Sequence, residues 1–101
     1  MHITYSYKGG ELTVFLTGEL DHHTAKAARD AIDDIVSLRP VSTLVLNLDG
    51  LGFMDSSGIG LVLGRYKLLS ETGAKLELSV NNAAIRRIFE MSGVNRLISI
   101  K

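Results

Sequence analysis

The chain has 101 residues, enough for one small domain with a single core. Lysine plus arginine and aspartate plus glutamate both number 11, and this balance argues against a nucleic-acid-binding protein. Cysteine is absent, which excludes disulfides and thiolate metal sites. The N-terminus lacks the features of a signal peptide, and no apolar run approaches the roughly 20 residues of a membrane-spanning helix. We therefore expect one soluble, cytoplasmic domain without membrane contact.

Two alternating patterns predict a β-hairpin at the N-terminus. Residues 3–7 alternate apolar and polar side chains, and residues 12–16 repeat this alternation. The Gly9-Gly10 dipeptide between them is a strong hairpin-turn signal. The pattern breaks at residues 18–21, so we expect the second strand to end before them.

Helical and strand-like segments then alternate. Residues 22–38 have helical spacing, and Pro40 ends this helix. Residues 41–48 form an apolar run, and their composition predicts a central parallel strand that is apolar on both faces toward its end. A second helix is expected at residues 57–72, with Gly73 at its C-terminus.

The C-terminal third adds a strand, a helix and a strand. We expect the strands at residues 75–80 and 97–100. Asn81 or Asn82 can cap the intervening helix, which Gly93 ends. The order β-β-α-β-α-β-α-β predicts an α/β domain with three helices and a mixed sheet. The sheet should have an antiparallel hairpin at one edge and right-handed crossovers between parallel strands elsewhere.

Two serines lie where the central strand leads into the second helix. The first turn of a helix has backbone N–H groups without partners, and the macrodipole is positive there. Ser56 or Ser57 can therefore cap this helix, and the same place can hold a phosphate. Asp55 and Gly58 flank the pair. On the local sequence alone, a cap and a phosphate site remain equally open.

A second polar loop follows another strand, and it contains Asp21, His22 and His23. Loops that leave strand ends of an α/β sheet often share one rim, where binding sites gather. We therefore expect this loop to lie near Ser56 and Ser57.

The second helix contains two glycines on one side, although a helical glycine costs about 0.5–1 kcal/mol relative to alanine. Gly60 and Gly64 lie four residues apart, on a face expected to carry Leu61, Arg65 and Leu68. Either a neighbouring element of the same chain packs closely there, or a partner docks on this face.

Catalysis and metal binding have weaker support. Ser57, a histidine (His22 or His23) and an aspartate (Asp21 or Asp55) supply the components of a hydrolase triad, but the Gly-x-Ser-x-Gly elbow is missing. Adjacent histidines on a helix do not face one another, and no third ligand is suitably spaced, so no metal site is expected.

Four motifs resemble the STAS-domain anti-sigma factor antagonists, in particular those of sporulation. They are Leu16–Ala25, Phe53–Gly60, Leu63–Lys67 and Phe89–Gly93. The resemblance spans nearly the whole chain and implies a STAS fold with one domain, residues 1–101. Members of the family continue past the last strand with a helical tail. The sequence up to Lys101 does not include this tail.

The resemblance implies a partner-switching mechanism. The unphosphorylated protein would bind an anti-sigma factor that is also a serine kinase, and so release the sigma factor. The kinase would phosphorylate Ser57, with Asp55, Ser56 and Gly58 supporting the site, and a serine phosphatase would reverse the reaction. ATP and Mg²⁺ would belong to the kinase, so the chain itself needs no cofactor, and it would be a monomer when free.

The partner-binding residues implied by this comparison come from both motifs. They are Asp21, His22, His23, Gly60, Leu61, Gly64 and Arg65. The alternatives are a STAS domain of another system, such as a stressosome scaffold or the cytosolic part of an anion transporter, and a small serine hydrolase.

Overall fold

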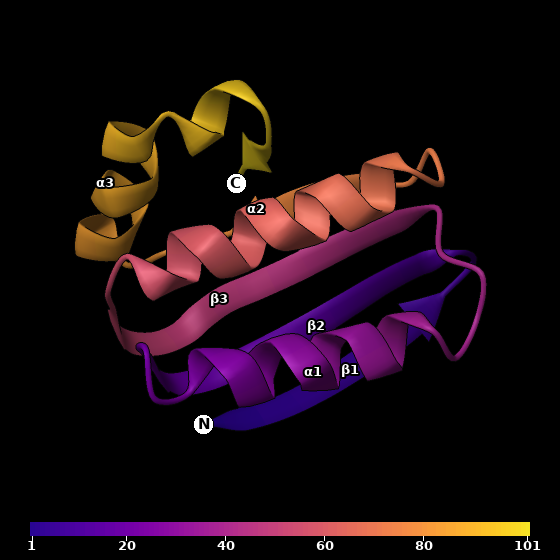
Figure 1. Cartoon of the computed structure of the whole chain (residues 1–101), viewed down its shortest axis with the longest axis horizontal. Coiled ribbons are helices and arrows are strands. Elements are labelled where there is room, and N and C mark those ends of the chain that lie inside the picture. Colours follow the sequence, from indigo (N-terminus) through magenta and orange to yellow (C-terminus); the bar gives the residue numbers. More distant parts are fainter.

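The computed structural model describes all residues from 1 to 101, and it is built on one five-stranded sheet (Figure 1). The strands lie side by side in the order of the sequence. They are β1 (His2–Lys8), β2 (Glu11–Leu20), β3 (Thr43–Met54), β4 (Lys75–Ser79) and β5 (Ser99–Ile100). β1 and β2 are antiparallel, and every other neighbouring pair is parallel. The predicted mixed sheet with an antiparallel hairpin at its edge is confirmed.

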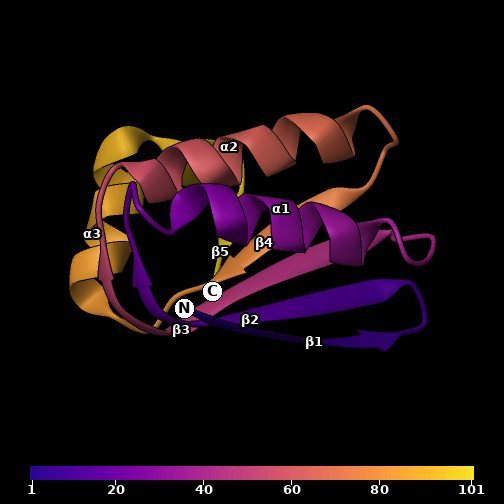
Figure 2. The ribbon, with the colours of Figure 1, turned by 60° about the horizontal axis from the view of Figure 1, so that its bottom comes forward.

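Three helices connect the parallel strands. They are α1 (Ala25–Val36), α2 (Ser57–Ser70) and α3 (Ala83–Ser92), and a 3₁₀ turn, η1 (Val94–Arg96), follows α3. Right-handed crossovers between strands in consecutive order bring their helices to the same side of the sheet. Figure 2 shows α1 and α2 side by side over one face, with α3 standing at one end of the sheet. None of the helices is both long and apolar enough to cross a membrane.

The core lies between the sheet and these helices, and 21 buried apolar residues form it. Leucines of β2 and β3 point into it together with Ile32 of α1, Val62 of α2 and Phe89 of α3. The opposite face of the sheet is uncovered: Phe15 is 39% exposed there, and its neighbour Asn47 is only half-buried. The expectation that β3 is apolar on both faces is therefore wrong, because no helix covers the second face.

β2 and β3 extend further than the sequence pattern predicted, to Leu20 and Met54 instead of residues 17 and 48. Gly18 has a φ of +112°, which suits glycine, and the register of the pair shifts beside it. Gly50 lies so close to Thr17 that a Cβ atom would overlap the threonine methyl group. Gly18, where the sequence pattern breaks, and Gly50 thus permit a closely packed, irregular extension of the two strands.

Helix ends agree well with the predicted capping chemistry. The side chain of Asn82 accepts hydrogen bonds from the N–H groups of Ala84 and Ile85, which caps α3. Gly93 ends α3 with a φ of +84°. The last strand is shorter than predicted, because the N–H groups of Leu97 and Ile98 donate to the carbonyl of Val94 in the turn that follows η1.

Candidate functional site

The ends of β2 and β3 bring the two polar loops together. Leu20 pairs with Met54 at the last position of both strands, and the N–H of Asp55 donates to the carbonyl of Leu20 at 3.2 Å. In Figure 1 the junctions before α1 and before α2 lie at the same end of the sheet, beside α3. The predicted shared rim is confirmed, and the extension of β2 and β3 creates it. We call the loop residues 21–24 and 55–57 the rim.

Asp55, not a serine, caps α2. Its Oδ1 accepts a hydrogen bond of 2.8 Å from the backbone N–H of Ser57, whereas the side chain of Ser56, the N-cap residue, makes no capping bond. This bond holds the pKa of Asp55 below its usual value against the opposing effect of desolvation, and the Ser57 hydroxyl and His22 add smaller effects in the same direction. The helix therefore begins without using either serine hydroxyl as its cap, and the capping role considered for the serines is wrong.

Asp21 organises the loop before α1. Its Oδ1 accepts hydrogen bonds from the N–H groups of His23, at 2.9 Å, and Thr24, at 3.1 Å. Desolvation favours the protonated acid, but these bonds and the nearby His23 outweigh it and hold the pKa of Asp21 below its usual value. The hydroxyl of Thr24 donates in turn to the carbonyl of Glu19. Asp21 is thus an ionised, half-buried residue whose carboxylate fixes the shape of the rim.

The two histidines of the rim are solvent-exposed. Nδ1 of His22 lies 3.8 Å from Oδ2 of Asp55, and the rings of His22 and His23 are 4.0 Å apart between centroids. Neither ring forms a hydrogen bond with Ser57, so the structure gives no nucleophile–base pair of the kind that a serine hydrolase uses. No group of three histidine, cysteine, aspartate or glutamate side chains is placed to bind a metal ion.

The exposed face of α2 differs from the predicted one. Leu61 and Arg65 are buried, at 5% and 7% exposure, so neither belongs to an exposed contact surface. They face the core because the helix is oriented by Val62 and Leu69, which are also buried. Along α2 from the rim, Ser56, Gly60, Leu63 and Lys67 are exposed and Gly64 is half-buried, and we call these five residues the α2 face. Leu63 is 37% exposed and belongs to this face, although the sequence pattern did not predict it there.

Gly60 and Gly64 are not explained by packing within the chain. A Cβ atom added at either position would meet no other atom within 4 Å. The alternative that a neighbouring element of the same chain requires these glycines is therefore wrong. Two glycines in the middle of a helix lower its intrinsic stability, and they leave a flat strip of exposed backbone beside Leu63.

Gly58 has the opposite environment. It is buried, and a Cβ atom there would overlap Sδ of Met54. Gly58 therefore lets the first turn of α2 pack against the last residue of β3. This contact and the Asp55 cap together fix the position of Ser57 at the start of α2.

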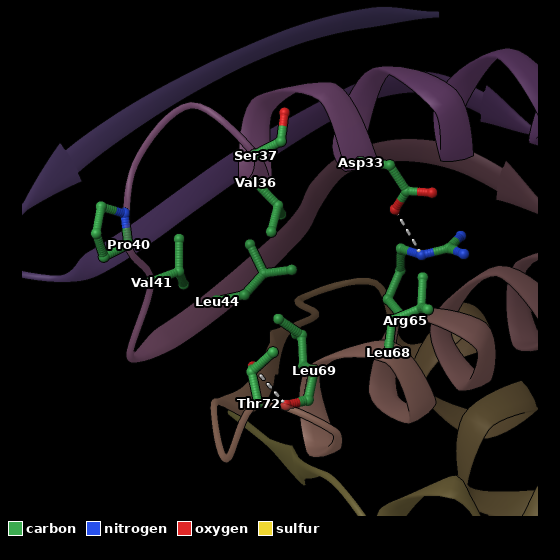
Figure 3. Close-up of a pocket in the computed structure, with 10 residues that line it drawn as sticks. All are labelled: Asp33, Val36, Ser37, Pro40, Val41, Leu44, Arg65, Leu68, Leu69 and Thr72. Atoms are coloured by element: carbon green, nitrogen blue, oxygen red, sulfur yellow. Dashed lines mark hydrogen bonds and ion pairs between the residues drawn. The ribbon is translucent and has the colours of Figure 1, made fainter.

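A cavity lies away from the rim, between the C-terminal halves of α1 and α2 (Figure 3). Its volume is about 510 Å³. The residues that line it are Asp33, Val36, Ser37, Pro40, Val41, Leu44, Arg65, Leu68, Leu69 and Thr72. Nε of Arg65 lies 2.9 Å from Oδ1 of Asp33 at one end of the cavity. Arg65 thus links α2 to α1, which is the physical reason that it is unavailable on the surface.

This architecture and these motifs agree with known proteins. The chain belongs to the STAS domain family, whose model matches residues 2–101. It is 39% identical over 100 residues to the anti-sigma F factor antagonist of Paenibacillus polymyxa, an alignment that covers 99% of this chain and 86% of that protein. The resemblance to STAS-domain anti-sigma factor antagonists is confirmed.

Two solved structures that carry the name SpoIIAA share the fold. The anti-sigma factor antagonist SpoIIAA in its unphosphorylated form matches with a TM-score of 0.82 and 31% identity, over 99% of this chain and 88% of that one. The Bacillus cell fate determinant SpoIIAA in its phosphorylated form matches with a TM-score of 0.73 and 31% identity, over 99% of this chain and 91% of that one. The predicted STAS fold is therefore confirmed.

Proposed function

We propose that the chain is an anti-sigma factor antagonist of the sporulation type and that phosphorylation of Ser57 switches its partner. Its relative in Paenibacillus polymyxa is named an anti-sigma F factor antagonist, and SpoIIAA has both an unphosphorylated and a phosphorylated form. The observation that carries the proposal is the arrangement at the rim. The half-exposed Ser57 lies beside the loop that contains the ionised Asp21, and the α2 face that continues from it has no side chains at Gly60 and Gly64.

Ser57 is the better phosphoacceptor of the two serines. It aligns with the second serine of the family motif, and it occupies the first position of α2, where the Asp55 cap and the Gly58 contact fix its backbone. Its hydroxyl caps no helix, and its effect on Asp55 is smaller than that of the backbone N–H bond that caps α2. A phosphoryl group can therefore be added and removed without breaking a bond that maintains the fold.

The partner is an anti-sigma factor with serine kinase activity. It would contact the free Oδ2 of Asp21 and the exposed surface around His22 and His23, and would place its own backbone or a flat side chain against Gly60 and Gly64. Leu63 provides an apolar contact in the centre of the α2 face. Side chains larger than glycine at positions 60 and 64 would hold the partner away from α2.

Phosphorylation would end this contact through charge and bulk. A phosphoserine adds about −1.5 to −2 charges beside the carboxylates of Asp55 and Asp21. The rim would then carry a large hydrated anion where the kinase has to exclude water. A serine phosphatase would restore the binding form. ATP and Mg²⁺ belong to the kinase, and the antagonist acts as its substrate and not as an enzyme.

The test is to incubate the purified chain with an anti-sigma F factor and ATP, and to locate phosphate by mass spectrometry. We expect one phosphate, on Ser57. Ser57→Ala should remain unmodified and still form a complex with the anti-sigma factor, while Ser56→Ala should be phosphorylated normally. Phosphate on Ser56 in the Ser57→Ala variant, or no binding to the anti-sigma factor, would contradict the proposal.

A further inference from the structure

A phosphate on Ser57 would enter a region that already carries negative charge. Asp55 lies two residues before it and Asp21 lies on the adjacent loop, and the pKa of each is lowered by hydrogen bonds. The phosphoryl group therefore needs either a positive partner on the protein or complete exposure to water.

The start of α2 offers few free donors. The N–H of Ser57 is taken by Oδ1 of Asp55, and the N–H of Gly58 is taken by the carbonyl of Asp55 at 3.1 Å. The N–H of Ile59 donates to the carbonyl of Ser56 at 3.1 Å. A helix start usually attracts anions through unpaired N–H groups, but here the carboxylate of Asp55 already occupies that position.

Permanent cations are also scarce near the rim. Neither residues 9–25 nor residues 40–64 include a lysine or an arginine. The next cation after each stretch is engaged elsewhere: Lys26 lies 2.9 Å from Asp30, and Arg65 is buried against Asp33. The two segments of the rim thus provide only His22 and His23 as groups that can become positive.

We propose that His22 is the side chain that pairs with the phosphoryl group of phosphorylated Ser57, an inference that rests on the assignment of Ser57 as the acceptor. Nδ1 of His22 already lies 3.8 Å from Oδ2 of Asp55, whose other oxygen binds the backbone of Ser57. The His22 side chain is 72% exposed, so its ring can rotate from Asp55 to the phosphate without disturbing the core.

His23 is less suited to this role because it interacts with the other carboxylate of the rim. Its backbone N–H donates to Asp21, and its positive form favours the charged state of that residue. The charged groups around His22 are Asp21 and His23 on its own loop and Asp55 at the start of α2. On α3, Arg86 is bound to the carbonyls of Val80, Ile100 and Lys101, whereas Arg87 is exposed and forms no ion pair.

Pairing with His22 has a consequence for the phosphorylated state. The phosphate would be held at the surface of its own chain by an imidazole, whose positive form attracts the phosphate dianion more strongly than the monoanion. Each group should favour the charged form of the other, so the phosphate should reach its dianionic form at lower pH with His22 than without it.

The experiment introduces phosphoserine at position 57 during translation, which makes it independent of any kinase. The phosphate is then titrated by ³¹P NMR in three proteins: the otherwise unchanged chain, His22→Asn and the matched control His23→Asn. We expect the midpoint to rise by about half a pH unit in His22→Asn, as for the loss of one solvent-exposed charge pair, and to stay within about 0.1 unit in His23→Asn. Amide spectra verify that both variants fold.

An unchanged midpoint in His22→Asn would overturn the assignment and would mean that the phosphate is exposed to solvent or pairs with Arg87. A change in His23→Asn alone would also overturn it. If the kinase failed to modify Ser57, the proposed function would fail while this titration could still succeed. The two failures are therefore distinguishable.

Discussion

The backbone N–H of Ser57 donates to Oδ1 of Asp55 at 2.8 Å, so that the residue proposed as phosphoacceptor is held by the carboxylate two positions before it. This bond caps α2 and leaves the Ser57 hydroxyl free of any capping role. The same carboxylate would repel a phosphoryl group on that hydroxyl. One side chain therefore fixes the acceptor in place and adds its own negative charge beside a phosphate on that residue.

The first prediction separates two roles of Asp21. Asp21→Ala removes the acceptor for His23 and Thr24, so the melting temperature should fall by about 4–8 °C, as for the loss of a helix cap. Binding to the anti-sigma factor should weaken as well. Asp21→Asn keeps an oxygen acceptor but loses the charge, and it should bind at least about tenfold more weakly with a nearly unchanged melting temperature. Normal binding of Asp21→Asn by calorimetry would remove Asp21 from the interface.

The second prediction uses two glycines two residues apart. Gly58→Ala would force a methyl group against Met54 and should reduce the free energy of unfolding by about 1–3 kcal/mol. Gly60→Ala meets open space and should raise it by about 0.5–1 kcal/mol, because alanine favours the helix. Urea unfolding of both variants measures the difference. Equal effects would mean that α2 does not pack on the end of β3 as described.

The third prediction tests the α2 face. Gly64→Leu places a side chain in open space, so the fold should remain stable while binding to the anti-sigma factor weakens by about tenfold or more. Ser70→Leu adds the same side chain at an exposed position roughly 20 Å from Ser57 along the helix and serves as the control. If both variants bind like the wild type, the partner does not use this face.

The fourth prediction concerns acid. The pKa of Asp55 is lowered from 3.8, chiefly by the hydrogen bond from Ser57, so the native state binds this proton less readily than the unfolded chain. The resulting stabilisation is present above the unfolded value and is lost as the pH falls through the lowered one. Thermal melts should therefore be constant from about pH 7 to 5 and fall below about pH 4. The acid-dependent decrease should be smaller in Asp55→Asn, and an identical decrease would show that this carboxylate does not contribute.

The sequence predicted the features that depend on local chemistry. The Asn82 cap, the end of α3 at Gly93 and the hairpin turn each depend on a few adjacent residues and agree with the structure. The extension of β2 and β3 depends on contacts between distant segments. Gly18 and Gly50 resemble breaks in their own strands, and only the paired strands show why small residues are required there.

The orientation of α2 could not be predicted for a similar reason. Apolar residues surround this helix, so its periodicity does not define a single buried side. Arg65 appeared to be a surface residue because it is charged, yet its partner Asp33 lies on another helix. The proximity of Asp21 to Ser57 was predictable, because both loops follow neighbouring parallel strands.

The most direct test compares the amide NMR spectra of the chain with and without phosphate on Ser57. A switch that acts at the surface should shift signals chiefly in residues 20–24 and 53–64, because the added charge lies at the rim and no backbone hydrogen bond has to break. The strands at residues 3–16 and 75–80 should keep their chemical shifts. If the changes instead spread through those strands, the protein switches by rearranging its fold, and the surface mechanism is wrong.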